Sequence, residues 1–210
     1  MKQLFLSVIF LLIFCVSYAQ KFRGGIVAGV VNTDVFGTDP VDNDVDLHKV
    51  GFMFGGLVHT PIKEKYAAQM EITFVQKGSY YPADSLNPMY YLLRLNYIEV
   101  PLTFKDHVHF TIRGKSINKF DLEGGLSLGV LISAYQENSL GAYPFVDPQY
   151  HKTETALHIG LSYLISNNFV FNIRYSNSLI PIREHNGGVT YRFNRGEYNT
   201  VFAYTFRYIF

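Results

Sequence analysis

Segments of about ten residues in which apolar and polar side chains alternate recur along this chain, and they limit its fold more than any other feature. A period of two places the two kinds of side chain on opposite faces of a β-strand. The final segment shows the pattern clearly, because Phe202, Tyr204, Phe206, Tyr208 and Phe210 share one face. After the first twenty residues the chain has little helical periodicity and no apolar run of about 18 residues, which a membrane-spanning helix would need. The pattern predicts an all-β protein.

Eight such segments can be counted, and an even number lets both chain ends lie on one side of a membrane. Short connections at residues 61–65 and 166–168 alternate with long polar ones, an asymmetry typical of outer-membrane barrels with short periplasmic turns and long extracellular loops. The link at residues 105–117 is too long for such a turn and partly strand-like, so we expect it to extend the neighbouring strands below the membrane. The eight segments are residues 22–31, 49–60, 66–77, 92–104, 118–132, 153–165, 169–181 and 197–210.

The start of the chain has the three parts of a secretory signal peptide. Lys2 is followed by an apolar run over residues 4–16, and then by Ser17 and Ala19, small residues at the positions that a cleavage site requires. The run is too short to span a bilayer as a helix. We therefore expect a signal peptide over residues 1–19, cleaved after Ala19, and one barrel domain over residues 20–210, rather than an uncleaved anchor.

Loss of this leader changes both the cysteine content and the charge. Cys15 is the only cysteine, and Phe14 before it does not fit a lipoprotein signal, so the mature chain would carry neither a lipid anchor nor a disulfide. The leader holds one of the 18 basic residues and none of the 17 acidic ones, which leaves a formal charge of zero. A neutral chain argues against a nucleic-acid partner.

The alternation alone leaves two barrels open, a soluble lipocalin-like one and a transmembrane one. A soluble barrel would expose its polar face, and that face is usually richer in charge than the Gly, Ser, Thr, Asn and Gln found here. Small hydrogen-bonding side chains suit the crowded interior of an eight-stranded barrel. We therefore predict an eight-stranded antiparallel transmembrane β-barrel of the bacterial outer membrane, with apolar side chains against the membrane lipid.

This orientation places isolated charged residues inside the barrel, where they must pair. We expect an interior charge network, and we favour a packed polar core over an ion path for its role. Its predicted members are Arg23, Glu71, Glu99, Asp121, Glu123, Arg174 and Arg207.

The last residues carry a second predicted signal. Phe206, Tyr208 and Phe210 resemble the C-terminal aromatic signature by which the barrel assembly machinery recognises outer-membrane proteins. An ordinary final strand is the alternative.

Several stretches together resemble one family, the PorT-like outer-membrane barrels of Bacteroidetes, for which Gln20 directly after the leader is also typical. LNYIEVPL within residues 91–102 and YRFNRG at the start of residues 191–207 are the most specific of these stretches. The others are FRGGIVAG at residues 22–29, EITFVQKG at 71–78, Glu123-Gly124-Gly125 and RYSNS at 174–178. The resemblance covers nearly the whole mature chain and departs from the family at residues 105–117 and in the acidic first loop.

The resemblance implies a non-enzymatic accessory or scaffold component of type IX protein secretion, with other secretion-system proteins as partners. A small passive pore, or a structural or adhesive barrel unrelated to secretion, is the alternative interpretation. A third hypothesis is a hydrolase at the extracellular rim.

The sequence predicts no catalytic, cofactor or metal site. The seven histidines are scattered, and a hydrolytic set of His185, Asp147 and Ser139 has nothing in the sequence to place it. His107 and His109 alternate on one segment but lack a third ligand. The aspartates of residues 34–46 lack the register and closing Glu of a calcium loop.

Overall fold

A computed structural model describes residues 22–37, 47, 49–83, 88, 90–112, 115–142, 150–184 and 196–210, with no side-chain description for residues 109–117 and 142. Among the described residues, no helix is long and apolar enough to cross a membrane. Eight long strands carry the fold: β1 (Arg23–Phe36), β2 (Lys49–Pro61), β3 (Tyr66–Lys77), β5 (Tyr91–Ile112), β6 (Lys115–Asn138), β8 (Thr153–Leu164), β9 (Phe169–Ser178) and β11 (Gly196–Ile209). Three short ones join them: β4 (Tyr80–Tyr81), β7 (Gly141–Ala142) and β10 (Arg183–Glu184).

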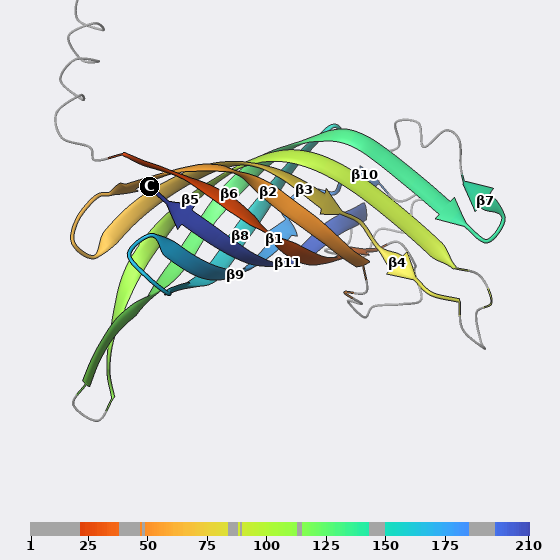
Figure 1. The fold of residues 1–210 in the computed structure, drawn as a ribbon. Helices are drawn as coiled ribbons and strands as arrows, with labels where there is room; N and C mark the ends of the chain where they lie inside the picture. The colour runs from red at the N-terminus through yellow and green to blue at the C-terminus, as the bar shows by residue number, and fades with distance from the viewer. Residues whose placement is uncertain are drawn as a thin grey trace, which may run out of the picture.

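The eight long strands form one closed antiparallel ring (Figure 1). Around the ring the order is β5, β3, β2, β1, β11, β9, β8 and β6, and the pairing of β5 with β6 closes it. The first and last strands lie side by side, with Gly25 opposite Ile209 and Phe36 opposite Tyr198. Closure leaves the barrel wall without an unpaired edge, as a strand structure in hydrocarbon requires. The predicted eight-stranded barrel is confirmed.

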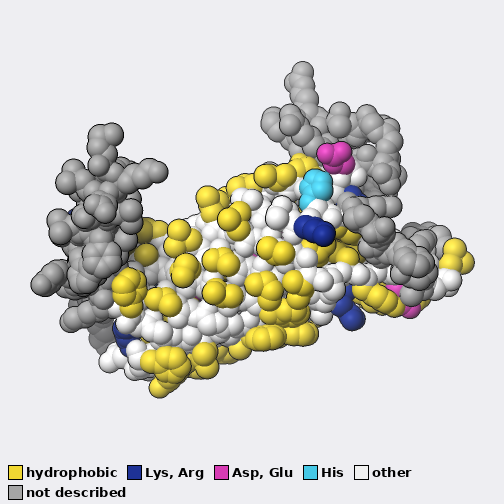
Figure 2. Space-filling view, turned by 90° about the horizontal axis from the view of Figure 1, so that it is seen from above, with side chains coloured by type: hydrophobic (Ala, Val, Ile, Leu, Met, Phe, Trp, Pro, Cys, Tyr) yellow, Lys and Arg dark blue, Asp and Glu magenta, His cyan; other side chains and the backbone are white. Residues whose placement is uncertain are grey.

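Burial shows that the polar face is the inner one. On β3, Gln69 and Glu71 are buried whereas Met70 and Ile72 are exposed. The same alternation runs around the ring, and Figure 2 shows hydrophobic side chains over the barrel wall with charged groups near its ends. The predicted direction of the two faces is confirmed.

Several strands run further than the sequence pattern predicts. β1 reaches Phe36 because its last residues still pair with β11, up to Phe36 opposite Tyr198. β5 and β6 contain 22 and 24 residues, since the link predicted at residues 105–117 is itself a hairpin, with Ile112 opposite Lys115. This hairpin lies at the same end of the barrel as the C-terminus (Figure 1). The strand extension expected there is therefore present.

Candidate functional site

The centre of the lumen is crossed by ion pairs between opposite walls. The Arg174 guanidinium on β9 binds Glu71 on β3 through two parallel hydrogen bonds, Nη2 to Oε1 at 2.7 Å and Nη1 to Oε2 at 3.0 Å. Its Nε donates to Glu123 Oε1 on β6 at 2.8 Å. Arg207 on β11 donates from Nη1 to Glu123 Oε2, also at 2.8 Å. These four side chains, which we call the central network, connect four strands of the ring.

Neutral side chains complete the central network. Arg207 donates from Nη2 to Asn172 Oδ1 at 2.8 Å and from Nη1 to Ser162 Oγ at 3.3 Å. Gln69 Nε2 donates to Glu71 Oε1 at 2.6 Å. Charge-assisted hydrogen bonds of this kind are about twice as strong as neutral ones, and together they satisfy charges that burial would otherwise make costly.

A second charged cluster lies inside the barrel nearer its loop end. Lys77 Nζ forms ion pairs with Glu99 and with Glu154 Oε2, the latter at 2.9 Å. Ser178 Oγ donates to Glu154 Oε1 at 2.5 Å. Lys77 also lies 5.1 Å from the centre of the Tyr97 ring, within the range of a cation–π contact. We call this group the Lys77 cluster.

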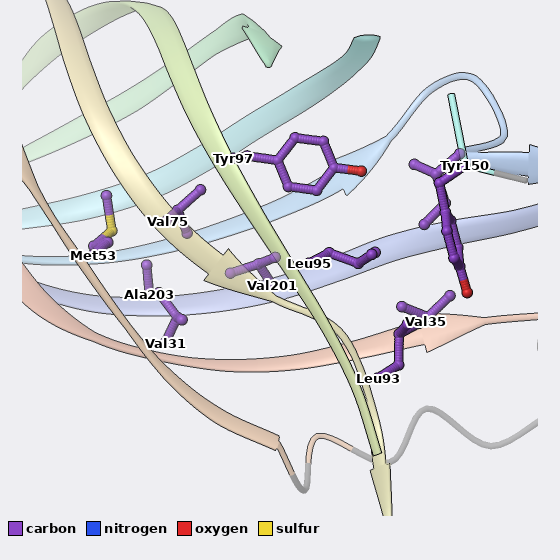
Figure 3. Close-up of a cluster of buried hydrophobic side chains, with 11 residues drawn as sticks. Val31, Val35, Met53, Val75, Leu93, Leu95, Tyr97, Tyr150, Val201 and Ala203 are labelled. Carbon is purple, nitrogen blue, oxygen red and sulfur yellow. The ribbon is translucent and has the colours of Figure 1, made fainter. Parts of the chain in front are cut away.

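Apolar side chains fill the lumen beyond the Lys77 cluster, towards the long loops. Figure 3 shows them gathered inside the ring, where they come from β1, β2, β3, β5 and β11 and include Tyr150. Several of these side chains have no solvent exposure at all. The cluster, called here the outer plug, comprises Val31, Val35, Met53, Val75, Leu93, Leu95, Tyr97, Tyr150, Ile182, Val201 and Ala203. A smaller apolar cluster of Val27, Leu57, Val170 and Ile209 lies at the other end.

The outer wall carries an apolar band of membrane dimensions. On β5 the outward-facing side chains are apolar from Phe104 to Ile98, and Asn96 and Asp106 lie on either side. The nine residues between Asn96 and Asp106 extend about 30 Å along the strand. With a strand tilt of about 40°, they span about 23 Å along the barrel axis, close to the roughly 25 Å apolar band of outer-membrane barrels.

Polar and aromatic groups mark the two borders of this band. At the loop end, Gln76 donates to Asn96 Oδ1 at 3.2 Å, and Asn96 donates to Ser133 Oγ at 2.8 Å. At the other end, ring contacts join Tyr66 with Phe104 and Phe120 with Tyr163, at 5.3 and 5.2 Å between centroids. Amphipathic rings at this level are characteristic of a membrane–water interface. We call this second border the aromatic girdle.

Beyond the loop-end border, β5 and β6 continue into a small sheet with β4 and β7. On it, the hydroxyls of Tyr90 and Tyr135 donate to the two oxygens of Glu137, at 2.6 and 2.8 Å. The hydrogen bond to Glu137 raises the pKa of Tyr90. Arg94 lies 5.8 Å from the Tyr135 ring centre. These side chains form a polar patch at the long-loop end of the barrel.

The structure brings together four of the seven residues predicted for the interior network, namely Glu71, Glu123, Arg174 and Arg207. Glu99 belongs instead to the Lys77 cluster. Asp121 pairs with His107, and Arg23 donates from Nε to the Phe210 carbonyl at 3.0 Å. These three residues lie apart from the central network because they are at other heights along the barrel axis. The alternation of apolar and polar residues does not reveal that height.

Sequence reasoning missed Lys77, Glu154 and Lys105, which are all nearly fully buried. Strand phase could have found them, because Lys77 is in phase with Glu71 on β3 and Lys105 with Glu99 on β5. Lys105 Nζ lies 3.8 Å from Glu123 Oε2. With these three included, the central network, the Lys77 cluster and Lys105 together bring four cations against four carboxylates.

The remaining predicted positions lie on the surface or outside the described residues. Phe206, Tyr208 and Phe210 point outward, with exposed fractions of 48, 44 and 66%. Of the hydrolytic set, Ser139 lies within the described residues, and its Oγ accepts the Tyr90 backbone N–H at 2.9 Å. His185 and Asp147 lie outside the described residues. Within the described ranges, no three His, Cys, Asp or Glu side chains are grouped to hold a metal ion.

One protein family matches the sequence of this chain. The family model described as an outer membrane protein beta-barrel domain matches residues 18–184, which is well over half of the chain. No curated protein matches the sequence.

Solved structures of outer-membrane proteins resemble the barrel. Ail of Yersinia pestis is 12% identical, with a TM-score of 0.48, and covers 90% of this chain and 98% of its own. The Neisserial surface protein A is 14% identical, with a TM-score of 0.46, and the match covers 90% of this chain and 97% of that protein. OprG of Pseudomonas aeruginosa is 13% identical, with a TM-score of 0.39, and the match covers 90% of this chain and 94% of OprG. The likeness concerns the fold alone.

Proposed function

The chain belongs to the family of outer membrane protein β-barrel domains and is a protein of the bacterial outer membrane, and we propose that it acts there as a non-enzymatic scaffold after cleavage of its leader behind Ala19. A scaffold works through the surfaces that it presents at its two ends. The observation that supports this role is the filled lumen, which leaves the ends of the barrel for function.

The contents of the lumen argue against a passive pore. The central network connects opposite walls, so an ion passing through would have to separate Arg174 from both Glu71 and Glu123. Separating a buried ion pair is costly because each charge is left without a counter-ion or water. The outer plug then presents an apolar barrier beyond it.

We expect the purified protein to show no single-channel steps in planar lipid bilayers. A well-known porin reconstituted in the same way serves as the positive control, and boiled and unboiled samples on a gel show that the barrel is folded. Reproducible conductance from the heat-modifiable, folded form would contradict the scaffold role and favour the pore.

The finer assignment that we propose is to the PorT-like barrels, as an accessory component of type IX protein secretion. It is supported by the sequence resemblance, above all LNYIEVPL and YRFNRG. The proposed partners are the barrel assembly machinery during insertion, through Phe206, Tyr208 and Phe210, and other secretion proteins afterwards. A scaffold with a filled lumen would contribute to export by binding those proteins rather than by conducting cargo.

Deletion of the gene should reduce the amount of exported cargo protein in the culture medium, and the plasmid-borne gene should restore it. Proteomic comparison of medium and periplasm measures the effect, since retained cargo accumulates in the periplasm. Unchanged export in the deletion strain would remove the secretion assignment while leaving the barrel and its location in place.

Surface adhesion is a second candidate, and the extracellular extension of β5 and β6 favours it. The small sheet there exposes Tyr135 and Arg94 above the membrane border. Cells that express the protein should then adhere to a host-cell or matrix surface more strongly than deletion cells, and Tyr135→Ala should lower that binding without changing the barrel.

A further inference from the structure

The hairpin between β5 and β6 extends past the barrel wall at the end opposite the long loops. β3 pairs with β5 as far as Tyr66 opposite Asp106, and β8 pairs with β6 as far as Tyr163 opposite Phe120. β5 nevertheless continues to Ile112 and still pairs with β6. The part beyond the barrel is therefore a two-stranded ribbon, visible in Figure 1 as a projection at the end where the C-terminus lies.

This ribbon has an edge on its β5 side. The last hydrogen bond from β5 towards β3 runs from the His107 N–H to the Lys65 carbonyl at 2.8 Å. Beyond it, no strand in the described part of the chain pairs with β5 on that side. The register between β5 and β6 shifts between Val108 and Phe110, where the extra residue is on β6. β5 itself keeps the alternation of an antiparallel strand, so the backbone groups of His109 and Thr111 point to the same side as those of His107. Such a row of N–H and C=O groups is a template for another strand.

The ribbon also carries an excess of positive charge. Residues 107–119 contain three basic residues, two histidines and no acidic residue. Lys119 is exposed on β6, and its Nζ lies 5.8 Å from the ring centre of Tyr163 on β8, so it faces away from the β5 edge. On the β5 side, Lys63 and Lys65 are exposed in the turn that borders the edge, where Lys65 also pairs with Asp106 at 3.2 Å. A strand that binds beside this edge would therefore be favoured by carboxylates.

The ribbon extends well beyond the aromatic girdle at this end of the barrel. Asp106 is the last position paired with β3, and the six residues that follow it, up to Ile112, extend about 20 Å at about 3.3 Å per residue. The side chains of this stretch alternate along the sequence between polar and apolar, from His107 and Val108 onwards. An added strand with the same two-residue period could match that alternation.

We propose that the β5 edge of this ribbon, at residues 107–112, binds an extended acidic segment of a periplasmic protein, which adds to it as an antiparallel or parallel β-strand. Backbone hydrogen bonds would supply affinity, and the basic residues would select an acidic partner. The inference rests on the proposed scaffold function and identifies the surface that meets a partner. A protein segment fits better than lipid headgroups, because only a backbone offers donors and acceptors at the spacing of a strand edge.

The test uses the full-length protein in nanodiscs of phosphatidylcholine, which carry no net charge. The probe is a fluorescent ten-residue peptide of alternating Glu and Val, and a matched peptide of alternating Lys and Val is the control. Fluorescence anisotropy measures binding, and amide hydrogen exchange reports protection of residues 107–112. The acidic peptide should bind and slow exchange at these amides, whereas the basic peptide should do neither.

Two variants separate the strand edge from the charge. Thr111→Pro removes an edge N–H and should weaken binding about tenfold, while Thr111→Val should leave it unchanged. Lys63→Glu should weaken binding about threefold, because it reverses one exposed charge in the turn that borders the edge. Lys119→Glu makes the same charge change on the β8 side of the ribbon, away from the edge, and should alter binding by less than about twofold. Heat-modifiable mobility verifies that every variant is a folded barrel.

Equal binding of the two peptides, or full binding to Thr111→Pro, would overturn the proposal. Protection of residues 107–112 that requires phosphatidylglycerol in the nanodisc, and not the acidic peptide, would assign the ribbon to lipid instead. The scaffold function is judged separately by cargo export. Normal export by the Thr111→Pro strain together with a defect in the deletion strain would reject the ribbon alone.

Discussion

Replacing Glu123 by Ala lowers the free energy of unfolding of the barrel by about 3–5 kcal/mol, because it leaves buried cations without their carboxylate. Glu123 accepts hydrogen bonds from Arg174 Nε and Arg207 Nη1, both at 2.8 Å, and its side chain has no solvent exposure. Urea unfolding in lipid vesicles, followed by the fraction that keeps its unboiled gel mobility, measures the loss.

Two further variants test whether the loss of stability comes from the buried carboxylate of Glu123. Glu64→Ala removes a carboxylate from an exposed turn and should change stability by less than about 0.5 kcal/mol. Glu123→Gln keeps the size and one acceptor oxygen, so its stability should lie between those of the wild type and Glu123→Ala. Equal unfolding midpoints for Glu123→Ala and the wild type would show that the central network does not stabilise the fold.

Gly125→Ala should destabilise the barrel by about 2–3 kcal/mol through overpacking, although the same change reduces unfolded-state entropy by about 0.5–1 kcal/mol. A Cβ at Gly125 would lie 2.1 Å from the Leu102 carbonyl oxygen and 2.7 Å from Thr103 Cα. Backbone cannot yield as a flexible side chain can, so β5 and β6 would have to move apart. The same urea assay measures the effect.

The neighbouring glycine is a matched control. A Cβ at Gly124 meets nothing nearer than the His158 carbonyl oxygen at 3.9 Å, so Gly124→Ala should be neutral or slightly stabilising. Gly55 and Gly56 on β2 repeat the contrast, with nearest atoms at 2.0 and 3.9 Å. If both members of a pair tolerate Ala equally, close approach of the strands is not what requires glycine there.

The two predictions concern the same property of a small barrel, its narrow interior. The strands approach so closely that some inward positions have no room for a Cβ, and the remaining inward side chains meet across the lumen. Arg174 and Glu71 are 103 residues apart in sequence and still form a bidentate pair. This crowding is the physical reason why the interior is a packed polar core between apolar clusters.

Local sequence determined the strands and the direction in which their side chains face. The two-residue period predicted all eight long strands, and the low charge of the polar face correctly indicated that it points inward. Both conclusions depend on neighbouring residues only, because alternation and composition act within one strand. The same reasoning anticipated that residues 105–117 would extend their strands.

Only the tertiary structure decided which inward residues meet. The stagger of the closed ring sets the height of each side chain along the axis, and this places Glu99 with Lys77 and Glu154 rather than with Glu123. The outer plug was not predicted either, since its members come from strands far apart in sequence. Phase along one strand tells whether a residue points inward, whereas the pairing of all eight strands tells what it touches.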